Sequence, residues 1–169
     1  MRHTISGTWI FMLVILFTLI FAAYIALTIN YSRSFRVKNE VLSLIEKNEG
    51  FTDNGVKLIN NYLTQSGYKT VGNCKQQSDA VVYGAKSIDS STGVANSIEK
   101  AQPGAKYYYC FTKYTGYHSY FKTRAYYKIT LFFHFDLPVL GDLYTFDVDG
   151  QTSEIDATYD SKNLNNWLR

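Results

Sequence analysis

The chain has 169 residues, of which 46% are hydrophobic and 18% are charged. That length allows one ordinary domain, and because the N-terminal segment is too apolar to join a soluble core, the remaining domain is small. The net charge of +3 is modest and spread along the chain, so it gives no reason to infer nucleic acid or an acidic substrate as a partner.

The N-terminal segment is long and apolar. No charged residue occurs between Thr4 and Ser32, and residues 9–31 are long enough to cross a hydrocarbon core of about 30 Å as a helix. Trp9 and Tyr31 mark its ends, as expected of aromatic side chains at membrane interfaces. A cleaved signal peptide is the competing interpretation, but the run exceeds a usual signal core and lacks a convincing A-x-A cleavage pattern. We therefore expect a single-pass membrane anchor.

Two features give opposite answers for the orientation of this anchor. Three basic residues follow the span within residues 33–38 and only Arg2 precedes it, so a positive-inside count places the C-terminal domain in the cytoplasm. Cys74 and Cys110 form an even pair in a small domain, which is typical of compartments where disulfides persist. Two separate buried thiols are the alternative. We expect a disulfide, and a C-terminal domain that is extracytoplasmic, at the cell surface.

The helical pattern continues beyond the span. Residues 32–50 keep an amphipathic rhythm, and Gly50 supplies the expected stop. Thr52 or Asp53 can cap a short second helix, which Gly67 ends. The apolar face of that second helix consists of Val56, Ile59 and Leu63.

From residue 68 onward the pattern predicts strands, and the 15 Tyr and 11 Phe favour them. We expect strands at YKTV (68–71) and AVVYG (80–84), an exposed loop over 86–104, and then strands at KYYYCFTKY, RAYYKITLFFHFDLP and LYTFDV. Asp149-Gly150 is a favoured two-residue hairpin turn, with a final strand at 152–155. The predicted fold is α+β: helices on one face of a small antiparallel sheet of about four strands, with residues 1–50 as anchor and amphipathic continuation and 51–169 as the domain.

This order of parts resembles that of pilins and pseudopilins. The C-terminal stretch YYKITLFFHFDLPVLGDLYTFDVDGQTSEI is similar to the strand, Pro-containing bend and hairpin of TadE-like minor pilins of tight-adherence systems. The resemblance covers most of the chain and is architectural. It implies a non-enzymatic, structural component of a pilus or secretion-type assembly, whose partners are membrane lipid, copies of itself or other pilin-like subunits, and an assembly apparatus.

The same resemblance implies a leader. In such families a prepilin peptidase cuts after a glycine, and a glutamate five residues later guides assembly. Gly7 is the candidate for the cut here, and Met12 stands where the glutamate is expected. This departure favours an anchored subunit at the base of an apparatus that is not processed, and the alternative for Gly7 is ordinary loop chemistry before a membrane helix.

Ala22 and Ala26 are candidates for helix packing. They are four residues apart, which places two small side chains on one helix face and lets another backbone approach closely in lipid. The alternative is that they are lipid-facing filler.

Residues for catalysis, metal or cofactor binding are not apparent in the sequence. His3, His118 and His134 are scattered, and the two cysteines lack CxxC spacing, so we expect neither an enzyme nor a zinc site nor a cofactor. The segment DVDGQTSE at 147–154 resembles a calcium loop weakly, but it lacks the third acidic ligand and the length of an EF-hand.

A second function is suggested by a band of aromatic and basic residues between 106 and 128. Aromatic platforms beside cations can hold single-stranded DNA or sugars, so the alternative function is a membrane-anchored surface module that binds DNA or polysaccharide. The less specific interpretation is that tyrosines suit half-buried strands and lysines protect sheet edges. The candidate ligand face consists of Tyr117, Tyr120, Lys122, Arg124 and Tyr126.

Overall fold

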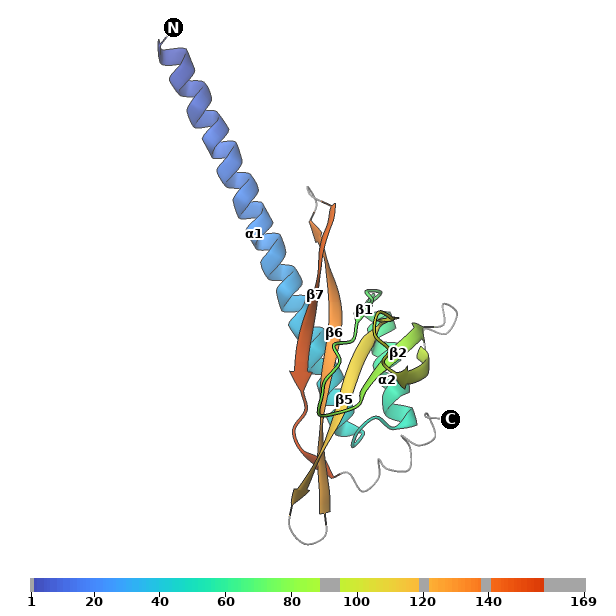
Figure 1. Ribbon diagram of the computed structural model, residues 1–169. Coiled ribbons are helices and arrows are strands. Elements are labelled where there is room, and N and C mark those ends of the chain that lie inside the picture. The colour runs from blue at the N-terminus through green and yellow to red at the C-terminus, as the bar shows by residue number, and fades with distance from the viewer. Residues whose placement is uncertain (1, 89–94, 119–121, 138–140, 157–169) are drawn as a thin grey trace.

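A computed structural model of the chain describes residues 2–88, 95–118, 122–137 and 141–156. One long helix, α1 (Arg2–Lys47), leads into a compact part formed by a second helix, α2 (Asp53–Gln65), and antiparallel strands. The N-terminal half of α1 stands away from the compact part as a stalk (Figure 1). The expected α+β class is therefore confirmed, with a long apolar helix, a short second helix and antiparallel strands.

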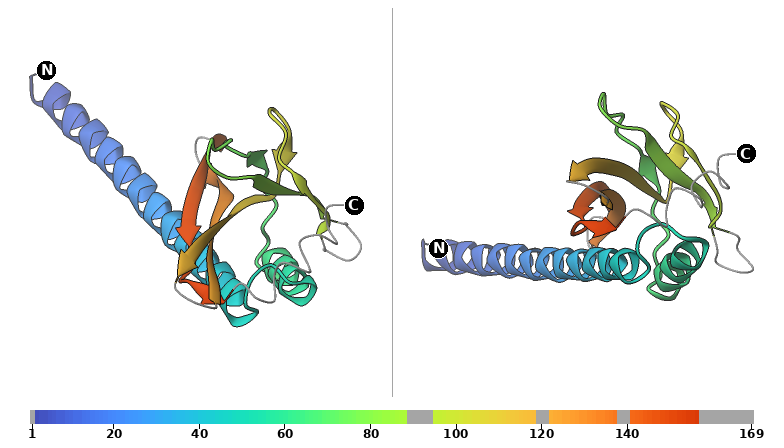
Figure 2. Two further views of the ribbon diagram at one scale, coloured as in Figure 1. Left: turned by 60° about the horizontal axis from the view of Figure 1, so that its bottom comes forward. Right: turned by 90° about the horizontal axis from the view of Figure 1, so that it is seen from below.

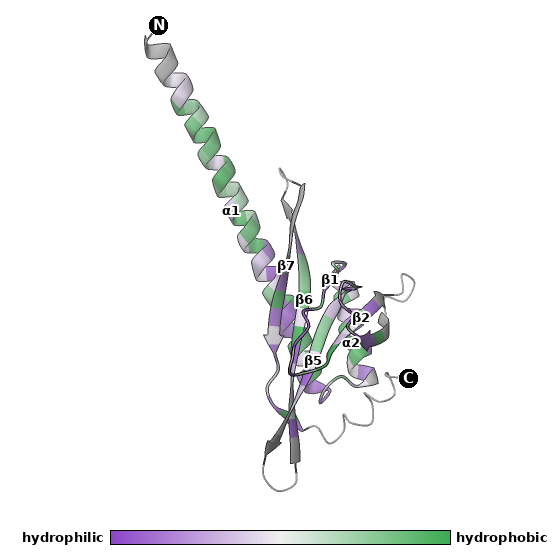
Figure 3. Cartoon of the chain, in the orientation of Figure 1, coloured by the Kyte–Doolittle hydropathy of each residue, from purple (hydrophilic) through white to green (hydrophobic). Residues whose placement is uncertain are grey.

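The two halves of α1 have different surroundings. Every side chain from residue 7 to residue 22 is exposed, and Figure 3 shows that this half is strongly apolar. Further along, Val37, Val41 and Ile45 are buried. Their spacing of four residues places them on one stripe of the helix, which packs against the sheet. The amphipathic continuation of the apolar helix is thus confirmed.

A tight turn separates the helices as the sequence indicates. Gly50 has a φ of 121°, which glycine adopts without a steric penalty, and its N–H donates to the carbonyl of Ile45 at 2.9 Å. Thr52 caps α2 because its hydroxyl oxygen accepts from the N–H of Gly55 at 3.1 Å. The predicted apolar face of α2 is buried, at Val56, Ile59 and Leu63.

The main sheet is antiparallel and has six strands, in the order β3-β2-β5-β6-β7 with β8 beside β6. β6 is the longest strand and pairs with β5 on one side and with β7 and β8 on the other. A separate two-stranded sheet joins β1 and β4. The strands are β1 (Gly72–Asn73), β2 (Val82–Ile88), β3 (Ala95–Lys100), β4 (Lys106–Tyr107), β5 (Tyr109–His118), β6 (Lys122–Leu137), β7 (Gly141–Gln151) and β8 (Ile155–Asp156).

Both helices lie on one side of this sheet, as Figure 2 shows. Phe51, in the turn between the helices, stacks on Phe111 with ring centroids 3.8 Å apart and meets Tyr127 edge-on. Side chains alternate between the faces of a strand, so odd-numbered positions of β5 and β6 enter this core. Burial of each such side chain stabilises the fold by roughly 1.5–3 kcal/mol. These core residues are Tyr109, Phe111, Tyr127, Ile129 and Leu131.

The opposite face of the sheet carries β1, β4 and a second apolar cluster. Cys74 and Cys110 are joined there by a disulfide, with their Cα atoms 5.7 Å apart. Tyr107 and Phe132 pack in the same cluster. A Cβ on Gly72 would overlap the ring of Phe132, so this position needs glycine for the ring to lie against the backbone of β1.

One predicted strand and one predicted loop are wrong. Residues 68–71 form no strand. The hydroxyl of Tyr68 instead binds the sheet where the β5–β6 pairing ends: it donates to the carbonyl of Tyr108 at 2.7 Å and accepts from the N–H of Phe132 at 2.6 Å. The expected loop at 86–104 instead contains the end of β2 and all of β3. β3 is an edge strand, and only Ile98 of its described side chains is buried, so its apolar alternation is weak.

The hairpin turn expected at Asp149-Gly150 is also wrong. Gly150 lies inside β7, paired with Ile129 of β6. A Cβ there would lie 2.9 Å from Leu42 and 3.0 Å from Lys38, so this glycine allows α1 to pack closely on β7. The segment after β7 does not return along β7 either, since β8 pairs with the N-terminal part of β6.

Candidate functional site

The first candidate site is the bare half of α1. Trp9 is 71% exposed, Leu16 59% and Tyr24 66%. Soluble proteins rarely leave a contiguous apolar surface of this extent in water. Within the described chain, α1 is the one helix long and apolar enough to cross a membrane. The stalk is therefore suited to membrane anchoring, as the sequence indicates.

Two threonines in this half fit an apolar environment. The hydroxyl of Thr18 donates to the carbonyl of Ile15 at 2.8 Å, and that of Thr28 donates to the carbonyl of Tyr24 at 2.9 Å. Hydrocarbon offers no partner to a polar group, so a hydroxyl in it must be satisfied within the helix. Both side chains meet that requirement.

The packing candidates and the leader candidate all lie within α1. Ala22 is exposed and Ala26 is half-buried, and a spacing of four residues keeps them on one face. A Cβ on Gly7 would meet nothing within 4 Å, so packing inside the chain does not require glycine at that position.

The second candidate site is the disulfide that ties the segment after β1 to β5. Its two cysteines are 36 residues apart in sequence. A cross-link closing a loop of that length stabilises a fold by about 4 kcal/mol in the chain-entropy model. Both cysteines are buried, so the bridge acts as an internal staple between the second apolar cluster and the sheet.

The predicted tyrosine and lysine band is divided between the two faces of the sheet. Its most buried members, such as Tyr109 and Tyr127, belong to the core beneath the helices. Tyr114 and Tyr126 lie on the other face, where their rings stack with centroids 4.9 Å apart. The hydroxyl of Tyr114 donates to Gln77. The band is therefore not one continuous ligand face.

The candidate ligand residues are brought together only in part. Arg124 pairs with Glu154 at 3.2 Å, which offsets its charge. Tyr117 and Lys122 lie on paired segments of β5 and β6, opposite Thr123 and His118 respectively. Tyr120 lies outside the described residues. Tyr126 stacks on Tyr114, as above.

The weak calcium-loop interpretation of 147–154 is wrong. Asp147 and Asp149 lie in β7 rather than in a loop, and Asp147 forms an ion pair with Lys75. Lys75 also donates a hydrogen bond to Asp147 in this ion pair, and this bond lowers the pKa of the Asp147 carboxyl below its usual value. Among the described residues, no group of three His, Cys, Asp or Glu side chains is placed to hold a metal ion.

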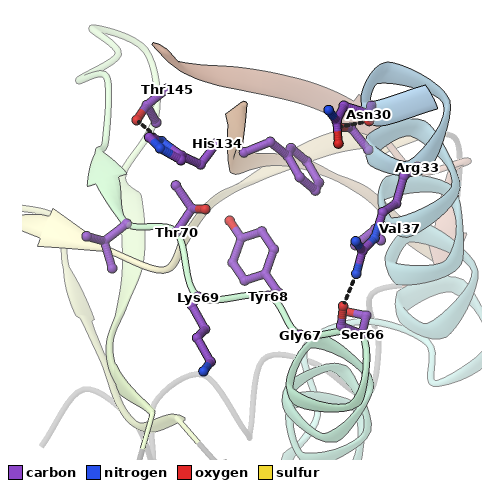
Figure 4. A pocket seen from close by; sticks show the side chains of 13 residues that line it. Asn30, Arg33, Val37, Ser66, Gly67, Tyr68, Lys69, Thr70, His134 and Thr145 are labelled. Atoms are coloured by element: carbon purple, nitrogen blue, oxygen red, sulfur yellow. Dashed lines mark hydrogen bonds between the residues drawn. The ribbon is translucent and has the colours of Figure 1, made fainter. Parts of the chain in front are cut away.

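The third candidate site is a pocket that sequence reasoning missed. It has a volume of about 550 Å³ and lies where α1 meets the compact part. One wall is α1 around Arg33, another is the segment that follows α2 around Tyr68, and the third is the β6–β7 hairpin at His134 and Thr145 (Figure 4). These elements are far apart in sequence, which is why no local motif marks the site.

Hydrogen bonds hold the pocket walls in place. The Arg33 guanidinium donates to the carbonyl of Ser66 at 2.7 Å, joining α1 to the end of α2. His134 Nδ1 and the hydroxyl of Thr145 lie 3.3 Å apart across the hairpin. Burial raises the pKa of the Tyr68 hydroxyl far above its usual value, so this group stays a neutral donor. The sequence signal that could have marked the site is Arg33, the first charge after the apolar span.

Comparison with known proteins adds no assignment, because no family model, no curated protein and no solved structure matches the chain.

Proposed function

We propose that this chain is a non-enzymatic, single-pass membrane subunit of a pilus or secretion-type assembly, with TadE-like or pseudopilin-like architecture. The proposal rests on the two different surroundings of α1 along its length. One unbroken helix is bare and apolar along its first half and forms part of the domain core along its second half. A subunit built in this way can contact others through the helix while the domain stays folded by itself.

The disulfide supports an extracytoplasmic domain, because such bonds persist in oxidising compartments and are rare in the cytoplasm. The basic residues after the span favour the opposite orientation, but a positive-inside count sets topology only as a bias. In this proposal α1 crosses the membrane over about residues 9–31 and the compact part lies at the cell surface.

Subunit contact is proposed to use the face of α1 that carries Ala22 and Ala26. Small side chains let two helix backbones approach closely in lipid, where van der Waals packing drives association. Gly7 enters the proposal as the site at which a peptidase would act if the leader is removed. Its replacement by alanine would fit the chain without a clash, so a loss of processing in that variant would report on the peptidase.

The test is cross-linking between copies in membranes. A cysteine introduced as Ala22→Cys or Ala26→Cys should form an oxidative cross-link between two differently tagged full-length chains, while Tyr24→Cys should not. Tyr24 lies about 200° around the helix from Ala22, on the opposite face. Equal cross-linking at all three positions, or at none, would contradict a specific helix interface.

A second candidate function is a surface module for DNA or polysaccharide, favoured by the stacked Tyr114 and Tyr126 rings. Aromatic platforms next to cations bind single strands and sugars. Under this alternative, Lys122→Ala with Arg124→Ala should abolish binding of a labelled oligonucleotide or polysaccharide and leave the Ala22→Cys cross-link unchanged. Binding that survives both substitutions would remove the alternative.

A further inference from the structure

The pocket beside α1 lies at the level where the helix leaves the membrane. The span ends near Tyr31, and Arg33 follows two residues later, about 3 Å along the axis. The polar headgroup layer on each side of the hydrocarbon core is roughly 5–8 Å thick. Arg33 and Ser34, on the α1 wall of the pocket, therefore fall at headgroup depth, about 3–5 Å beyond the end of the span.

One wall of the pocket belongs to a hairpin that points along α1 toward its N-terminal end. In Figure 1 the ends of β6 and β7 beside residues 138–140 point toward the N-terminal end of α1. His134 and Thr145, which line the pocket, lie on this part of the hairpin. The pocket therefore lies between α1 and the part of the hairpin that faces the proposed membrane.

The charge of the pocket is positive. Arg33 and Lys69 contribute to its lining, and no Asp or Glu does. Among the described residues, no carboxylate lies within ion-pair distance of either cation. The Ser66 carbonyl takes one N–H of the Arg33 guanidinium, which has five, so the group can still donate to an anion. Lys69 lies at the rim, with its side chain directed away from the centre (Figure 4).

The remaining lining is polar and small. Thr70 and Thr145 contribute hydroxyl groups to a volume of about 550 Å³, within the usual range for small-ligand pockets, whereas the hydroxyl of Ser34 donates to the carbonyl of Asn30 at 2.8 Å. Phosphate esters are bound in proteins by this combination of a planar guanidinium and hydroxyl donors. Val37 and Phe133 supply an apolar side on which the first carbons of a lipid can rest.

We propose that this pocket binds the phosphate headgroup of an anionic phospholipid, with Arg33 as the main contact, Thr70 as a secondary contact, and Lys69 adding positive charge at the rim. The inference rests on the membrane span of the proposed function. Arg33 is one of the basic residues whose count favours a cytoplasmic domain. Binding a lipid phosphate would give this residue a function in an extracytoplasmic domain.

The test uses the purified full-length chain in a neutral detergent, mixed with equal amounts of phosphatidylglycerol and phosphatidylcholine of the same acyl chains. Native mass spectrometry then gives the ratio of the two lipids retained. The wild-type chain should favour phosphatidylglycerol, and Arg33→Gln should lower that preference about fivefold, the effect of one basic residue near an anionic surface. Equal retention of both lipids by the wild-type chain would overturn the proposal.

Matched variants separate charge from structure. Arg36→Gln removes the same charge one turn further along α1, at an exposed position that does not line the pocket, and should leave the preference unchanged. Arg33→Lys should restore most of it. Lys69→Gln removes the charge of an exposed side chain at the rim, so it should lower the preference less than Arg33→Gln does and leave folding unchanged. An equal loss in Arg36→Gln and Arg33→Gln would refute a specific pocket.

A final arm distinguishes lipid from free phosphate. In this arm, millimolar inorganic phosphate is added to the chain in phosphatidylcholine micelles and the thermal unfolding midpoint is measured. If phosphate raises the midpoint of the wild-type chain but not of Arg33→Gln, and phosphatidylglycerol is not preferred, the site binds free phosphate and the lipid proposal fails. The Ala22→Cys cross-link is measured on the same variants. If the cross-link persists in Arg33→Gln, loss of the lipid site leaves the assembly function intact. If the cross-link is absent when Arg33 is unchanged, the result contradicts the assembly function but not the lipid site.

Discussion

At the scale of single residues, Tyr68 joins the segment after α2 to the sheet, at the end of the β5–β6 pair. It is 7% exposed, and its hydroxyl hydrogen-bonds two backbone groups, the carbonyl of Tyr108 and the N–H of Phe132. Those groups belong to segments on either side of β5. One side chain thus satisfies polar atoms that would otherwise be buried without partners.

Replacing Tyr68 with Phe should therefore be costly. Each buried backbone group left without a partner costs about 1–3 kcal/mol, so we expect Tyr68→Phe to lower the free energy of unfolding by about 2–4 kcal/mol. Chemical denaturation of the detergent-solubilised full chain, followed by near-UV circular dichroism, measures this loss. Tyr83→Phe is the control, since Tyr83 is half-buried and should change stability by less than about 1 kcal/mol. Similar effects of the two substitutions would contradict the bridging role.

Two buried tyrosines also set the alkaline limit of stability. Burial raises the pKa of both Tyr68 and Tyr109 far above the ordinary value of about 10. Above pH 10 the unfolded chain loses these protons and the folded chain keeps them, so the unfolded state binds fewer protons and stability falls as the pH rises. Below pH 10 this contribution is fully present. The free energy of unfolding should decline from about pH 10 upward, less steeply in Tyr109→Phe, and a flat profile would contradict the burial.

At the scale of elements, several boundaries could be predicted because local chemistry determines them. Gly50 ends the first helix region and Thr52 caps α2 through contacts with residues three to five positions away. Gly150 could not be assigned in this way. Its partner is Leu42, more than a hundred residues earlier, so a sequence that resembles a turn codes instead for a close helix-to-strand contact.

The strands were predicted in proportion to their burial. β5 and β6 alternate between two apolar clusters and have a clear pattern, whereas the sequence of the edge strand β3, ANSIEK, lacks such an alternation and resembles a loop. The pocket could not be predicted, because its three walls meet only through the fold. The pairing of Cys74 with Cys110 followed from the presence of two cysteines alone.

The packing of β2 on Tyr107 gives a prediction at this scale. Tyr107 is fully buried, and a Cβ on Gly84 would overlap its ring, so Gly84→Ala should force the two layers apart. Overpacking of this kind costs about 1–3 kcal/mol. Gly116→Ala is the matched control, because its nearest neighbour is 4.0 Å away, and it should be neutral. Thermal unfolding of both variants measures the change in stability. An unfolding midpoint of Gly84→Ala equal to that of the wild-type chain would contradict the tight contact.

At the scale of the whole molecule, the chain is a bare apolar stalk continuous with the core of a small disulfide-bonded domain (Figure 1). The stalk has no partner within the described chain, and the domain does not need it to close its own core. This division suits the first half of α1 to membrane anchoring, and the proposed function places subunit contacts on the same half.

The most direct measurement is thiol labelling of intact cells with a membrane-impermeant maleimide, before and after treatment with an impermeant reductant, with Cys74 and Cys110 read by mass spectrometry. An extracytoplasmic, disulfide-bonded domain should show no labelling before reduction and labelling of both cysteines after it, without lysis. Labelling that needs lysis but no reductant would mean free thiols in the cytoplasm, and it would contradict the anchored extracytoplasmic subunit proposed for this chain.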